Sequence, residues 1–132
     1  MDCNLTLITS VDGTESKLVK IAQAVETPSG ICFQYTDSNA SSILRFFPDF
    51  VEIERSGDYG MKLTLKAGET RAGVLSVGGQ DGELLVFTHK ISFRKQNNRF
   101  FAMLKYDLLF GAEKQEMRVR LQADFLGVGG SI

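Results

Sequence analysis

Three long stretches between Glu83 and Phe125 carry mostly apolar residues at every second position. A period of two over such lengths predicts half-buried antiparallel strands, with one face on a core and the other in water. The inward positions expected from this pattern are Leu85, Phe87, His89, Ile91 and Phe93 in the first stretch, Phe100, Ala102, Leu104, Tyr106, Leu108 and Phe110 in the second, and Met117, Val119, Leu121, Ala123 and Phe125 in the third.

The first 82 residues read as shorter strands separated by turn residues. Asp12-Gly13 is a strong hairpin signal, and a Pro-Ser-Gly turn follows at residues 28–30. In the strand between these turns, Val19, Ile21 and Val25 mark the apolar face that is expected to turn inward, although Leu18 and the alanines blur it. A bulge near Leu18 would reconcile the two faces. Together with the three long stretches, this gives about ten strands and no helical stripe.

These strands predict an all-β fold, a single antiparallel and mostly up-and-down β-barrel of about 8–10 strands. The chain reads as consecutive hairpins without a long crossover, and closing the sheet removes the two edges that an open meander exposes. Residues 1–126 are expected to form this one domain, and the Gly-rich residues 127–132 a flexible C-terminal tail. Gly73, in the middle of a short strand, predicts a kink or a close backbone approach.

Charge and composition exclude several classes of function. The 15 basic and 16 acidic residues are mixed and give a net charge of −1, so no nucleic-acid partner is expected. No signal peptide or long apolar segment is visible, which predicts a cytoplasmic protein without a membrane role. Cys3 and Cys32 have no metal-ligand or redox spacing and are expected to be reduced thiols, although a bond between them stays open. The single histidine excludes a multi-histidine metal site, and no cofactor or metal is predicted.

Several strand and turn motifs resemble those of a known family. They are Val51-Glu52-Ile53-Glu54-Arg55-Ser56-Gly57, Met61, Gly68-Glu69-Thr70 with Gly73, Thr88-His89-Lys90-Ile91 and Tyr106-Asp107-Leu108. In these residues the chain resembles the YwiB-like family of uncharacterised bacterial proteins. The resemblance covers most of the chain, although the Asn97-Asn98 turn is shorter than the family's usual Gly-containing turn. It implies a calycin-type barrel related to lipocalins and a bacterial cytoplasmic setting, and it transfers no activity.

Three polar residues fall on the predicted inner faces: Arg55, His89 and Tyr106. An inward charge needs a carboxylate, carbonyl groups or an open mouth, because burying it unpaired is costly. These three residues are therefore the candidate ligand-binding anchors of an otherwise apolar cavity. The alternative is structural: Arg55 plugs one end of the barrel, His89 and Tyr106 are satisfied core residues, and inward phenylalanines fill the lumen.

The leading function is a non-catalytic barrel that binds a small apolar or amphipathic ligand in its interior. A second hypothesis is an interaction or homodimer module that uses the outer face of the second long strand, where Phe101, Met103 and Leu109 are out of phase with the core. An enzyme ranks third, because no catalytic constellation is visible and His89 would have to lie at a cleft near a nucleophile or an acid. Asp107 is expected on the solvated surface.

Overall fold

A computed structural model describes residues 1–126, which form a closed barrel of ten antiparallel strands and contain no helix. The strands are β1 (Asp2–Val11), β2 (Thr14–Thr27), β3 (Gly30–Asp37), β4 (Ala40–Phe46), β5 (Val51–Ser56), β6 (Tyr59–Leu65), β7 (Thr70–Val77), β8 (Gln80–Gln96), β9 (Arg99–Phe110) and β10 (Glu113–Phe125). The predicted fold class is thereby confirmed. The predicted tail, 127–132, lies outside the described residues. Among the residues described, no helix has the length and apolar character needed to cross a membrane.

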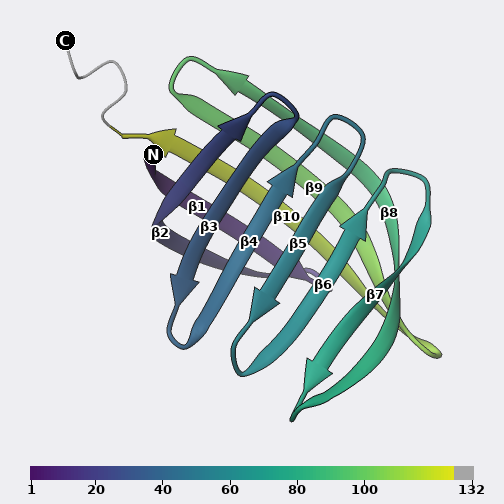
Figure 1. Cartoon of the computed structure of the whole chain (residues 1–132). Coiled ribbons are helices and arrows are strands. Elements are labelled where there is room, and N and C mark those ends of the chain that lie inside the picture. Colours follow the sequence, from purple (N-terminus) through teal and green to yellow (C-terminus); the bar gives the residue numbers. More distant parts are fainter. Residues whose placement is uncertain (127–132) are drawn as a thin grey trace.

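Each strand pairs with the next one along the chain, and β1 closes the barrel by pairing with β10, from Cys3 opposite Phe125 to Val11 opposite Met117. Turns therefore alternate between two ends of the barrel (Figure 1). We call one the tyrosine end, which carries the β1–β2, β3–β4, β5–β6, β7–β8 and β9–β10 turns. The other, with the remaining turns, is the phenylalanine end. At the predicted β1–β2 hairpin, Asp12 and Gly13 have φ angles of 50° and 88°, as a type I′ turn requires.

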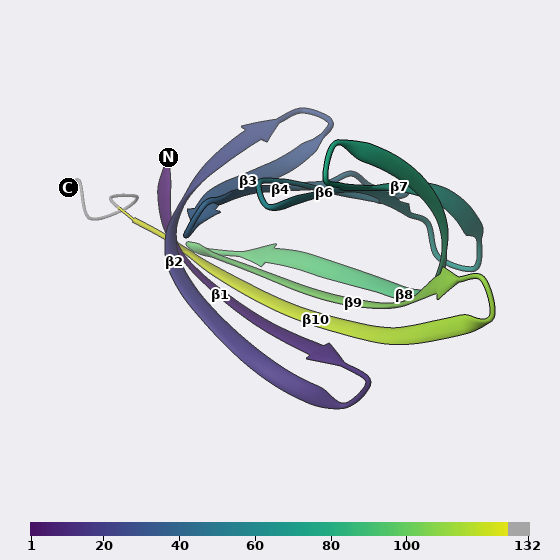
Figure 2. The same cartoon turned by 90° about the horizontal axis from the view of Figure 1, so that it is seen from below.

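β2 and β8 are corner strands that belong to both halves of the barrel. β2 pairs with β1 as far as Gln23 and with β3 from Gln23 onward. β8 pairs with β7 from Gln80 to Phe87 and with β9 from Leu85 to Gln96. Figure 2 shows the result: β3 to β7 lie in one curved half, β8, β9, β10 and β1 lie in the other, and β2 runs between them.

Phenylalanine rings pack together inside the barrel toward the phenylalanine end. Phe33, Phe46 and Phe100 are almost fully buried, and the Phe100 ring centroid lies 5.1 Å from that of Phe33 and 5.0 Å from that of Phe46. Phe93 and Phe125 join the same cluster. Leucine and valine side chains from β1, β6, β9 and β10, with Ile53 of β5, continue the core toward the other end. Phe110 does not join it, because the residue is 37% exposed at the end of β9.

The predicted inner face of β2 is wrong. Val19, Ile21 and Val25 are all more than half exposed, whereas Ala22 and Ala24 are buried. Ala24 pairs with Phe33, whose ring occupies the lumen, so a small side chain fits at this position and a β-branched one does not. The strand keeps one alternation throughout, without a bulge at Leu18: Leu18 packs against the core, and the β-branched apolar side chains face outward.

The predicted inner face of β8 is correct only in its second half. Leu84, Val86 and Thr88 face the core in the first half, and Leu85 is 42% exposed. The register then shifts between Thr88 and Lys90, so that His89 is the extra residue of a β-bulge. Beyond the bulge, Ile91 and Phe93 pack against the core as predicted. One inserted residue is enough to exchange the two faces of a strand.

The corner strands leave two backbone edges that no strand of residues 1–126 pairs: Thr14–Ala22 of β2 and Lys90–Gln96 of β8. In Figure 2 the β1–β2 hairpin projects away from the barrel with β2 outermost. Lys20 lies on the inner face of this edge, opposite Leu5, and its Nζ is 3.5 Å from the Asp37 carboxylate. A charged side chain turned inward is a known protection against edge-to-edge association.

The two cysteines are free thiols on different strands. Cys3 is buried in β1, and Cys32 is partly exposed in β3. Burial raises the pKa of both thiols above the ordinary value.

Candidate functional site

Arg55 lies on the inner face of β5 at the tyrosine end, as predicted. The alternation of β5 places Val51 and Ile53 in the core and continues inward to Arg55. Across the sheet, Arg55 pairs with Ser42 of β4 and Met61 of β6, and Ser42 pairs with Tyr35 of β3. These neighbours share its face, because residues directly opposite in an antiparallel pair point to the same side.

The Arg55 guanidinium is held at the rim of the barrel by two contacts. Its Nη2 donates to Asp58 Oδ1 at 2.6 Å, and its Cζ lies 4.2 Å from the centroid of the Tyr59 ring. The hydrogen bond from Arg55, together with one from the Tyr59 backbone N–H, holds the pKa of Asp58 below its usual value. These contacts fix the direction of the guanidinium and leave other donors of the group available.

The Nε–H donor of Arg55 is buried and has no hydrogen-bond partner among residues 1–126. Native proteins pair the great majority of their buried polar groups, so this donor is available to a water molecule or to an acceptor group of a ligand. A neutral buried donor left unpaired costs about 1–3 kcal/mol, and a charged one costs more.

Tyr106 points inward from β9 and is buried, as predicted. Burial raises the pKa of its phenol strongly, and the nearby phenols of Tyr59 and Tyr35 raise it further. Burial also raises the pKa of Tyr35, against a hydrogen bond with Ser42 that lowers it. All three tyrosines of the chain therefore gather around Arg55 at one end of the barrel.

His89 does not belong to this group, and the prediction that it faces the interior is wrong. It lies on the bulge of β8, its side chain is 39% exposed, and its Nε2 is 2.7 Å from Oδ2 of Asp107 on β9. Asp107 faces outward between the inward residues Tyr106 and Leu108, so the pair lies on the outer surface. The expectation that Asp107 is solvated is wrong, because only 12% of its side chain is exposed and His89 contacts its carboxylate.

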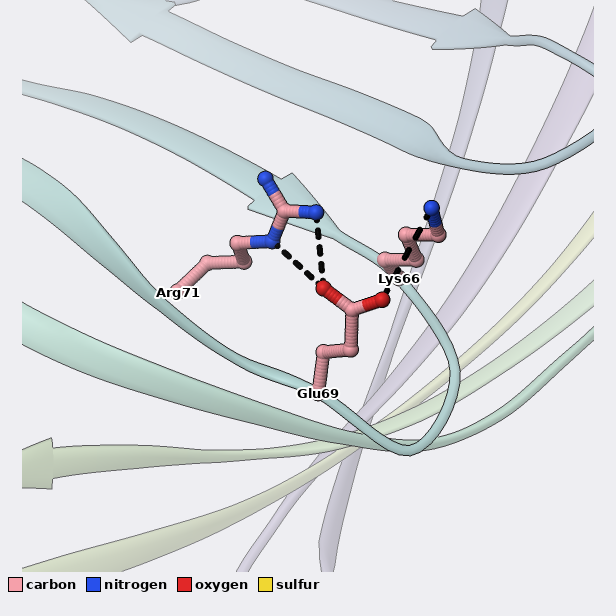
Figure 3. Close-up of polar contacts among 3 residues, drawn as sticks. All are labelled: Lys66, Glu69 and Arg71. Carbon is pink, nitrogen blue, oxygen red and sulfur yellow. Dashed lines mark hydrogen bonds and ion pairs between the residues drawn. The ribbon is translucent and has the colours of Figure 1, made fainter.

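The turn between β6 and β7 packs against this bulge. The backbone N–H of Gly68 donates to the Thr88 carbonyl at 2.8 Å, and the Thr88 N–H donates to the Glu69 carbonyl at 3.2 Å. Glu69 also binds Arg71, whose Nε and Nη2 both donate to its Oε1, and lies near Lys66 (Figure 3). The Arg71 contact lowers the pKa of the Glu69 carboxyl. This turn thus ends the pairing of β7 with β8 just before the bulge.

Two cavities adjoin the residues considered for function. One, of about 470 Å³, lies between the β5–β6 and β7–β8 turns and is lined by Arg55, Asp58, Tyr59 and Met61. Its lining also includes residues on the outer face of β5 to β7: Glu54, Lys62, Val74 and Ser76. The second, of about 460 Å³, is a groove on the outer face of β1, β10, β9 and β8. No group of three or more His, Cys, Asp or Glu residues within 1–126 is arranged to hold a metal ion.

The outer groove contains two cross-strand rows. One runs Thr6, Gln122, Phe101, Arg94, and the other Ile8, Arg120, Met103, Ser92. Phe101 and Met103, which the sequence pattern singled out, lie at its centre, and the Arg94 guanidinium is 5.4 Å from the Phe101 ring centroid. Leu109 lies outside the groove, opposite Leu85.

Sequence reasoning missed Ser42 and Tyr59 as members of the tyrosine end. Ser42 lies in a short strand whose faces cannot be assigned from Ile43 to Phe47 alone, and Tyr59 reads as a turn residue. The pairing register could have identified Ser42. Once β4, β5 and β6 are paired through their short turns, Ser42 and Met61 must lie on either side of Arg55.

Comparison with known proteins gives a family and a fold. A family described as "Domain of unknown function (DUF1934)" matches residues 9–121. The crystal structure of the ywiB protein from Bacillus subtilis matches with a TM-score of 0.81 and 14% sequence identity, over 94% of this chain and 91% of that chain. No match is found among curated protein sequences. The predicted resemblance to the YwiB-like family is confirmed.

Proposed function

Because the chain belongs to the DUF1934 family, a domain of unknown function, we propose a role from the geometry of its barrel: it binds a small amphipathic ligand at the tyrosine end. The ligand presents a carboxylate or another anionic acceptor to Arg55 and places its apolar part against Met61 and Val74, the apolar side chains that β6 and β7 contribute to the cavity beside Arg55. The role is binding without catalysis. Arg55 and Tyr59 line the ligand cavity, and Tyr106, Tyr35 and Ser42 complete the site on the inner side of the barrel. His89 has no part in it.

The observation that carries this proposal is the buried, unpaired Nε–H of Arg55. Asp58 and Tyr59 hold the guanidinium in place, so the free donor has a fixed direction. An arginine prefers to meet a carboxylate through two parallel hydrogen bonds, which makes an anionic group the best acceptor here. The cavity of about 470 Å³ beside Arg55 falls in the size range of small-ligand sites.

Tyrosine fluorescence tests the proposal directly. The chain contains no tryptophan, and its three tyrosines all lie at this end, so its intrinsic fluorescence reports on the proposed site alone. Octanoate should change the emission and saturate, whereas octylamine, with the opposite charge, should not. Arg55→Met should weaken octanoate binding about tenfold or more. Arg118→Met, on the outer face of β10, serves as the matched control.

Equal responses to octanoate and octylamine, or an unchanged affinity in Arg55→Met, would refute the anionic site. Native mass spectrometry of the freshly purified protein gives an independent reading, because a retained natural ligand adds a defined mass.

A second candidate function, assembly or partner binding, is supported by the outer groove. Its apolar centre, Phe101 and Met103, is flanked by Arg94 and Arg120, and Met103 is 39% exposed. Light scattering measures self-assembly: if this face joins two copies, Phe101→Glu should yield a monomer, whereas Lys105→Glu on the same strand should not. A wild-type monomer over a wide concentration range would exclude the homodimer.

The proposal also keeps two expectations from the sequence: a calycin-type relation to lipocalins and a cytoplasmic location in bacteria. The barrel fold and the likeness to a Bacillus subtilis protein are consistent with them. Cell fractionation with an antibody to the protein tests the location.

A further inference from the structure

The second half of β8 presents an unpaired strand edge. From Lys90 to Gln96 the strand pairs with β9 on one side, and no strand within residues 1–126 pairs with it on the other. The hydrogen bonds from the β6–β7 turn to β8 are made at Thr88, so the open edge begins just past the bulge at His89. Such an edge carries a row of backbone N–H and C=O groups that can pair with an extended chain.

An aromatic cavity of about 500 Å³ lies against this same edge. Its walls are the β2–β3 and β4–β5 turns on one side and Phe93, Arg94 and Lys95 of β8 on the other. The rings of Phe46 and Phe100, which are 1% and 2% exposed, contribute to its lining together with Phe93 and Phe47. The cavity has room for one large apolar side chain beside the open edge.

The open edge is strongly basic. Residues 90–96 include Lys90, Arg94 and Lys95 and no acidic residue. Lys95 binds Glu26 across the cavity, whereas Lys90 and Arg94 form no ion pair in the described part of the chain. Lys90, Ser92 and Arg94 face outward, and Ile91 and Phe93 face the core.

We propose that this edge binds an extended segment of a partner protein, which adds to β8 as a strand. The segment inserts one large apolar side chain into the aromatic cavity. Its acidic residues flank that anchor, because side chains on either side of an inward residue point outward, to the face that carries Arg94 and, two residues beyond Ser92, Lys90. Strand addition accounts for both the open edge and the adjacent cavity: main-chain hydrogen bonds supply affinity, and the cavity selects the side chain.

The test uses a fluorescein-labelled peptide, Thr-Thr-Glu-Phe-Glu-Thr-Thr, with the whole chain as receptor. Versions with Trp, Leu or Ile in place of Phe cover the anchor chemistry, and a version with Lys in place of both Glu tests the charge. Fluorescence anisotropy should show binding by at least one acidic peptide. Its Lys counterpart should bind about tenfold more weakly or worse. Hydrogen exchange of residues 90–96 should slow when the acidic peptide binds.

Two further arms separate strand addition from simple attraction. Methylating the peptide nitrogens of alternate residues blocks one edge of the peptide, and one of the two alternate sets should abolish binding. Arg94→Glu should lower affinity for the acidic peptide and raise it for the Lys peptide, while Arg118→Glu leaves both unchanged. The proposal is overturned if none of the four acidic peptides binds, if neither methylated set loses binding, or if exchange slows along β2 instead of β8.

Discussion

The Nε2 atom of His89 lies 2.7 Å from Oδ2 of Asp107, and this contact ties the bulge of β8 to β9 on the outside of the barrel. Removing the imidazole takes away this hydrogen bond and leaves the Asp107 carboxylate without its His89 partner. We expect His89→Ala to lower the free energy of unfolding by about 1–3 kcal/mol. Urea denaturation measures this change, and Lys90→Ala, at the neighbouring exposed position, should have little effect.

A double-mutant cycle separates this contact from local packing. Asp107→Asn combined with His89→Ala should cost less than the sum of the two single changes, because residues in direct contact do not contribute independently. Strictly additive losses would mean that the two groups do not stabilise each other.

Burial of Tyr106 predicts a loss of stability at high pH. The pKa of this phenol is raised in the folded protein, whereas in the unfolded chain it ionises near its ordinary value of about 10. Its contribution is therefore complete below about pH 10 and is lost as the pH rises further, since only the unfolded chain releases the proton. Urea denaturation from pH 8 to 11 should show this decline, and Tyr106→Phe should make it shallower. An equal slope in both proteins would contradict the assignment.

Gly73 is predicted to tolerate no side chain. A Cβ at this position would lie 2.7 Å from Leu63 Cδ2 and 3.0 Å from the Lys62 carbonyl oxygen, which confirms the close approach expected from the sequence. We expect Gly73→Ala to destabilise the protein by about 1–3 kcal/mol. Gly82→Ala on the neighbouring strand is the control, because its nearest atom would lie at an ordinary 3.7 Å. Thermal denaturation compares the two.

Lys20 is expected to protect the open edge of β2 from association. Its charge lies on the inner side of that edge, and Val19 and Ile21, exposed on the other side, make the strand prone to pairing without it. Lys20→Val should increase light scattering during refolding. Lys105→Val removes the same charge from β9, a strand paired on both sides, and should scatter much less. Similar scattering from both variants would exclude an edge effect.

The long strands show how much of the fold the alternation of apolar residues can predict. In β9, every second residue from Phe100 to Leu108 faces inward as the alternation predicts, and the same holds in β10 from Val119 to Phe125. Both strands run without a bulge. β8 has the same alternation, but the extra residue at His89 exchanges its faces, and nothing in the residue types marks the bulge.

The prediction of the inner face of β2 is wrong for another reason. The pattern assumes that the most apolar side chains are buried, whereas here the available volume decides: Phe33 fills the space next to Ala24, and the larger Val25 is excluded. The candidate site shows the same division. The inward positions of Arg55 and Tyr106 could be predicted from the alternation of their strands. The position of Tyr59 beside Arg55 depends on the geometry of a turn, and the outward position of His89 depends on the bulge.

The pairing of β1 with β10 means that the barrel can close only late in folding. Cys3 pairs with Phe125 and Leu5 pairs with Ala123, so one edge of β1 stays unpaired until β10 has been synthesised. Contacts so distant along the chain are expected to make folding slow. During synthesis, the emerging N-terminal strands are therefore exposed to other nascent chains for longer than in a protein built from local contacts.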